Sequence, residues 1–143
     1  MALLNYTTQI SVEKTIGEIQ QCLVAHGAKA ILTEYDDNGY ITALNFKITL
    51  EKRDIGFKLP TDWRPVLKIL ENDTKVPQRL CNQEQALRVG WRIIKVWVEA
   101  QMAIVETRMV KLEQVFFPYA VTKTGKTVYE TTLPLLLNHP KDE

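Results

Sequence analysis

Cysteines, long hydrophobic runs and an excess of one charge are all scarce in this chain. Its 143 residues include only two cysteines, Cys22 and Cys81, which form no CxxC pair. No stretch approaches the ~18 apolar residues of a membrane span. Eighteen basic and 17 acidic residues leave a net charge of +1. We therefore expect free thiols, a cytoplasmic location, no membrane contact and no global attraction to nucleic acid. The first residues carry no basic segment leading into an apolar one, so no secretory signal is predicted.

Residues that perform catalysis or bind metals are also sparse. Ser11 is the only serine, and His26 and His139 show no metal-ligand spacing with either cysteine. Segment 124–127 resembles the end of a phosphate-binding loop, but Ala120 occupies a position where that motif needs glycine. The sequence therefore predicts no enzyme, no metal site and no cofactor.

The first half of the chain predicts one helix and a sheet. Residues 3–10 favour a short first strand, Ser11 is a good helix N-cap, and apolar residues at steps of three and four lead to Gly27. Asn38-Gly39 then separates two β-favouring runs, which is a strong hairpin signal. A third alternating run ends at Pro60. We predict an antiparallel β-meander with one face in water and the N-terminal helix packed on it.

The second half of the chain is predominantly helical in pattern. A short helix is predicted from Asp62 or Arg64, with Pro65 in its first turn. Asn82 is then a good N-cap for one long C-terminal helix over 83–112. Together these elements predict an α+β fold with a single domain at 1–137 and a frayed tail at 138–143.

The long helix carries two adjacent apolar rows, which is a wider stripe than a one-sided surface helix needs. Either the helix is buried in the core, or part of it forms an oligomer interface; both interpretations stay open. The apolar segment 128–137 would add to an exposed patch in a monomer. We therefore predict self-association, as a homodimer.

Basic side chains gather at two places. One group follows helical spacing beside a tryptophan, and the other shares the wet face of the predicted sheet. Basic groups grip phosphates and an aromatic ring can stack on a base, although an ordinary solvated surface explains the same pattern. The candidate nucleic-acid or nucleotide-binding residues are Arg88, Arg92, Lys95, Trp91, Lys47 and Lys58.

Two segments, WRIIKVWVEAQ at 91–101 and LEQVFFPY at 112–119, resemble a family of small uncharacterised proteins from bacteria and their phages. Segments 31–36 and 56–60 are similar to it too. The resemblance transfers no activity and no site residue. It implies a phage- or mobile-element-associated role, such as nucleic-acid handling or interference with a host defence.

Two classes of function follow from these observations. The first is a small non-enzymatic protein that binds nucleic acid or a nucleotide-like ligand. The alternative is a protein–protein interaction factor, such as an inhibitor of a host defence system or a subunit of a larger complex. Composition favours neither class.

Overall fold

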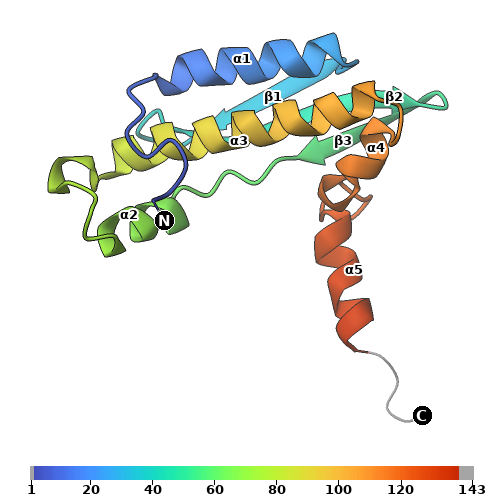
Figure 1. Ribbon diagram of the computed structural model, residues 1–143. Coiled ribbons are helices and arrows are strands. Elements are labelled where there is room, and N and C mark those ends of the chain that lie inside the picture. The colour runs from blue at the N-terminus through green and yellow to red at the C-terminus, as the bar shows by residue number, and fades with distance from the viewer. Residues whose placement is uncertain (1, 139–143) are drawn as a thin grey trace.

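The computed structural model describes residues 2–138, which form an α+β fold of three strands and five α-helices. Helices α1 and α3 lie side by side over the sheet, α2 lies beside the N-terminal half of α3, and α5 projects away from the body (Figure 1). The elements are α1 (Val12–Ala25), β1 (Ala30–Tyr35), β2 (Ile41–Leu50), β3 (Arg53–Lys58), α2 (Arg64–Asn72), η1 (Gln78–Leu80), α3 (Gln83–Glu106), α4 (Leu112–Val115), η2 (Phe117–Tyr119) and α5 (Val128–Leu137).

The sheet is the predicted antiparallel meander, with strand order β1-β2-β3. Gly39 adopts φ +83° in the first turn, where the Asp36 backbone N–H donates to the Tyr40 carbonyl at 2.9 Å. Positive φ costs glycine nothing, which explains the hairpin signal. In the second turn Glu51 and Lys52 both have positive φ, as a tight turn between antiparallel strands demands.

The core lies between the sheet and the α1–α3 layer. Phe46 and Phe57 stack at a centroid distance of 5.0 Å, and Phe116 meets Phe46 edge-on at 5.6 Å. Helices α1 and α3 contribute Ile19 and Trp91 to the same cluster. A second cluster joins α2 to the beginning of α3. Because β2 alternates, side chains next to Phe46 in the sequence point to the opposite face of the sheet.

The prediction of a first strand at 3–10 is wrong. This segment forms turns, with the Tyr6 and Thr8 backbone N–H groups donating to the Leu3 and Asn5 carbonyls. The carbonyls of Tyr6 and Thr8 accept hydrogen bonds from the side-chain amide of Gln85 instead of a neighbouring strand. The segment is therefore fixed against α3, and its β-favouring residues do not join the sheet.

The prediction of one long C-terminal helix over 83–112 is wrong as well. Helix α3 begins after Asn82 as expected but ends at Glu106, and it lies in the middle of the chain's element order. Arg108 adopts a left-handed φ of +67°, which turns the chain back into α4. That reversal places Phe116 in the core, where it is fully buried. The burial of this aromatic side chain offsets the strain at Arg108.

The C-terminal segment forms a helix that contacts the core cluster through Val128, its first residue. None of the α5 residues from Val128 to Leu137 is buried, and Thr127 caps the helix by accepting from the Glu130 backbone N–H. The predicted frayed tail, 138–143, lies outside the described residues except for Asn138. Across residues 2–138, no helix is both long enough and apolar enough to cross a bilayer.

Candidate ligand cleft

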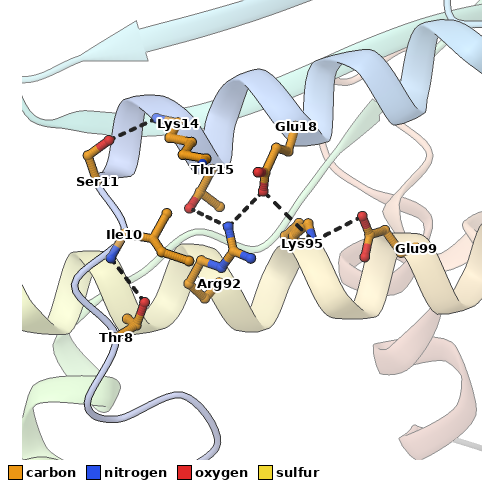
Figure 2. Close-up of polar contacts among 9 residues, drawn as sticks. All are labelled: Thr8, Ile10, Ser11, Lys14, Thr15, Glu18, Arg92, Lys95 and Glu99. Carbon is orange, nitrogen blue, oxygen red and sulfur yellow. Dashed lines mark hydrogen bonds and ion pairs between the residues drawn. The ribbon is translucent and has the colours of Figure 1, made fainter.

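Two of the predicted binding residues are engaged between helices rather than free in solvent. Figure 2 shows Arg92 reaching from α3 toward Thr15 and Glu18 on α1. Its Nη1 donates to Glu18 Oε1 at 2.7 Å and to Thr15 Oγ1 at 3.2 Å. Lys95 Nζ lies 3.8 Å from the same Glu18 oxygen and 3.1 Å from Glu99 Oε2. These contacts hold α1 against α3 and neutralise both cations.

This network lowers the pKa of the Glu18 carboxyl. The hydrogen bond from Arg92 lowers the pKa of Glu18 most; burial opposes the shift, and the charges of Arg92 and Lys95 reinforce it. Glu18 therefore stays ionised well below neutral pH. A phosphate approaching Arg92 or Lys95 would have to displace a carboxylate already bound there.

The sheet lysines lie on the other side of the molecule. Lys58 pairs across the ladder with Asn45, and Lys47 with Gly56, on the face of the sheet opposite Phe46. Both lysines are exposed. The five predicted cations therefore do not converge, because the sheet separates Lys47 and Lys58 from the helices that carry the other three.

Trp91 cannot stack on a base in this conformation, because its indole is only 1% exposed and belongs to the main core cluster. Trp91 lies next to Arg92 in the sequence, but neighbouring residues on a helix can face the core and the solvent respectively. The prediction of Trp91 as a stacking residue therefore does not match its position.

Arg88 is the predicted cation that lines a concave surface. It lines a cleft of about 350 Å³ between the first half of α1, the β1–β2 turn and the start of α3. Its Nε donates to Gln85 Oε1 at 2.9 Å. Among residues 2–138, its two terminal guanidinium nitrogens make no hydrogen bond or ion pair. The head group is therefore oriented at one nitrogen, and the other two remain free to donate.

Gln85 sets that orientation from within the protein. The residue is 2% exposed, and its Nε2 donates to the carbonyls of Tyr6 at 2.9 Å and Thr8 at 3.0 Å. While the amide nitrogen donates to two carbonyls, the amide oxygen accepts the hydrogen bond from Arg88 Nε. A buried amide thus fixes both the N-terminal segment and the guanidinium in the cleft.

The rest of the cleft combines aromatic and acidic side chains. Tyr35 and Tyr40 come from the two sides of the β1–β2 turn, and Glu13 and Glu84 from the first turns of α1 and α3. A flat ligand could pack on the tyrosine rings and donate hydroxyl or amino hydrogens to the carboxylates. An anionic group could bind Arg88.

Sequence reasoning missed the partners of Arg88. Tyr35 and Tyr40 flank the hairpin turn, so both were recognisable as aromatic residues at one end of the sheet. Their proximity to Arg88 depends on how α3 crosses that end, which no local pattern shows. The sequence placed Gln85 in the helix after the Asn82 cap but gave no indication of its hydrogen-bond partners.

The opposite end of the α1–α3 pair carries a histidine–cysteine group without catalytic geometry. His26 Nδ1 lies 2.8 Å from the Cys22 carbonyl and Nε2 lies 2.6 Å from Glu106 Oε2. Burial raises the pKa of the Cys22 thiol, with Glu99 and Glu106 adding to the shift, so the thiolate is disfavoured. Within the part of the chain that the structure describes, no three His, Cys, Asp or Glu side chains are placed to hold a metal.

Comparison of the chain with family models, with curated proteins and with solved structures found no match.

Proposed function

We propose that this chain is a small non-enzymatic binding protein that holds a nucleotide-like ligand in the α1–α3 cleft. The observation that supports this function best is the orientation of Arg88, a residue that lines the cleft, by the buried amide of Gln85. A guanidinium fixed in this way binds a phosphate or carboxylate with little loss of side-chain entropy.

The charges around the cleft favour a ligand with few negative charges. Glu13 and Glu84 lie on its walls together with Arg88, so the three side chains carry a net charge of −1. These carboxylates would repel a triphosphate or a long polynucleotide. A nucleoside monophosphate can place its phosphate at Arg88, its ribose hydroxyls at a carboxylate and its base against Tyr35 or Tyr40.

Isothermal titration calorimetry with AMP, GMP, CMP and UMP tests the proposal, with ATP as the highly charged comparison. We expect one monophosphate site per chain with a micromolar to sub-millimolar Kd, and weaker binding of ATP. Arg88→Leu should weaken the monophosphate by about 10–100-fold, the effect of losing a charge-assisted hydrogen bond of ~1.5–3 kcal/mol.

Arg79→Leu is the matched control, because Arg79 is an exposed arginine in η1, outside the lining of the cleft. It should bind like the parent protein. If no monophosphate binds, or if Arg88→Leu and Arg79→Leu behave alike, the cleft is not the binding site.

A protein partner is the second candidate function, and the exposed apolar surface of α5 supports it. The role of an inhibitor of a host defence, or of a subunit in a larger complex, would use such a surface. Co-purification of one defined protein at fixed stoichiometry, lost when the α5 leucines are replaced by serine, would favour this function. Polynucleotide binding through Lys47 and Lys58 has less support, because two exposed lysines form a small basic patch.

A further inference from the structure

Helix α3 carries an apolar strip on the side that faces away from the sheet. The strip contains no charged residue, and its members recur at steps of three and four along the second half of the helix. Val96 is 41% and Ile104 is 37% exposed, and the alanines between them are open to solvent. We call these residues the α3 strip: Ile93, Val96, Ala100, Ala103 and Ile104.

Helix α5 presents a second apolar surface. Leu135, Leu136 and Leu137 are 71%, 69% and 67% exposed. The helix stands away from the body on the side of α3 where α2 also lies (Figure 1). Glu130 is the only charged residue between Val128 and Leu137, and it lies in the first turn, where it caps the helix.

A third feature is an apolar groove of about 350 Å³ between α2 and α3. Its walls include Trp63, Pro65, Val66, Gly90 and Ile93. The absence of a side chain at Gly90 opens the groove toward Val66, whose Cγ2 would lie 3.6 Å from an added Cβ. The charged residue in the lining is Asp62, which already pairs with Arg64 at 2.9 Å.

We infer that the occupant of this groove is α5 of a second copy of the chain. If two α3 strips pack antiparallel about a two-fold axis near Val98, residue 104 of one copy lies opposite residue 93 of the other. The groove, at residues 90–93, then lies beside the end of the partner's α3, from which the partner chain continues into α4 and α5. Each copy therefore places its α5 beside the groove of the other copy, which makes the interface isologous and closed.

The surface area fits a modest dimer. Complete burial of a leucine or valine side chain removes about 60–120 Å² of apolar surface from water. The three α5 leucines, the half-exposed α3 strip and the groove walls therefore bury about 400–600 Å² per copy. The total of about 800–1,200 Å² is at the lower end of specific interfaces, and a micromolar dissociation constant is expected. Asp62, the charged residue of the groove lining, is already paired with Arg64.

This inference uses none of the residues proposed to touch the nucleotide, and its test is independent of ligand binding. Sedimentation velocity from about 1 to 200 μM should show the parent moving from a 16.5 kDa monomer toward twice that mass. A variant with Leu135, Leu136 and Leu137 all changed to serine should stay monomeric. Leu32→Ser is the matched control, because Leu32 is an exposed leucine on the sheet, and it should dimerise like the parent.

Gly90→Leu distinguishes the insertion of α5 into the partner's groove from a simple pairing of two α5 helices. The new side chain fills the groove from a helical position, so the variant should fold but dimerise at least tenfold more weakly. A mixture of Gly90→Leu with the triple-serine variant should form a heterodimer. The intact α5 of the Gly90→Leu chain can occupy the intact groove of the triple-serine chain. A parent that is monomeric throughout, a triple-serine variant that still dimerises, or a Gly90→Leu variant of parental affinity would each overturn the inference.

Discussion

Gln85→Leu is the substitution that tests the internal organisation of the cleft. Leucine is close to glutamine in size, suits a helix and removes every polar atom of the side chain. The structure then loses three hydrogen bonds: from Nε2 to the Tyr6 and Thr8 carbonyls, and from Arg88 Nε to Oε1. The variant should therefore be less stable and should release the N-terminal segment.

The expected magnitude follows from these bonds. Two neutral hydrogen bonds contribute about 0.5–1.5 kcal/mol each, and the one from the half-buried Arg88 contributes about 1 kcal/mol, because solvent screens its charge. Their sum is about 2–4 kcal/mol, offset by about 1 kcal/mol from burying the leucine. The free energy of unfolding should fall by about 1–3 kcal/mol, which lowers the Tm by about 3–15 °C for a chain of this length.

Urea denaturation followed by tryptophan fluorescence measures this change. Gln21→Leu makes the same substitution at an exposed site in α1 and should leave the midpoint within error of the parent. Equal midpoints for Gln85→Leu and Gln21→Leu would refute the reasoning, because they would show that the buried amide holds nothing in place.

Three further predictions concern the core, pH and the hairpin. Phe116→Ala should destabilise the protein by about 3–5 kcal/mol in chemical denaturation, since the ring is fully buried at the return from α3; a parental midpoint would show that α4 does not close the core. The pKa of His26 is raised, first by its backbone hydrogen bond to Cys22 and then, against burial, by Glu106. Its contribution to stability should therefore be complete below pH ~6.5 and lost as pH rises through the raised value; a His26→Gln variant with the same pH profile of unfolding as the parent would contradict this assignment. Gly39→Val should lower the thermal midpoint, because φ is +83° there and a β-branched residue resists positive φ; an unchanged midpoint would mean that the turn adopts another conformation.

Local signals were sufficient for the elements whose ends are fixed by nearby residues. Ser11 and Asn82 cap α1 and α3 by accepting from backbone N–H groups three residues later, and Gly39 makes its turn within the hairpin itself. In each case the hydrogen bond or the dihedral angle depends on a short segment. These positions could therefore be predicted without knowledge of the rest of the fold.

The parts that could not be predicted depend on residues distant in the sequence. Glu18 and Arg92 are 74 positions apart, and Gln85 and Tyr6 are 79 apart. Spacing along α3 showed that Arg92 is on a polar side, but it could not show that α1 supplies a carboxylate there. The end of α3 was missed for a different reason. Arg108 adopts positive φ there, and arginine is not a residue type that favours left-handed backbone.

Nuclear magnetic resonance titration of the labelled protein with AMP, GMP, CMP and UMP tests the central claim most directly. We expect saturable shifts for at least one nucleotide in the backbone amides of the cleft: the first turns of α1, the turn between Tyr35 and Ile41, and Arg88 with its neighbours at the start of α3. Lys47, Lys58 and the leucines of α5 should not respond. Shifts confined to the sheet lysines or to α5, or no saturable shift with any of the four nucleotides at millimolar concentration, would contradict it.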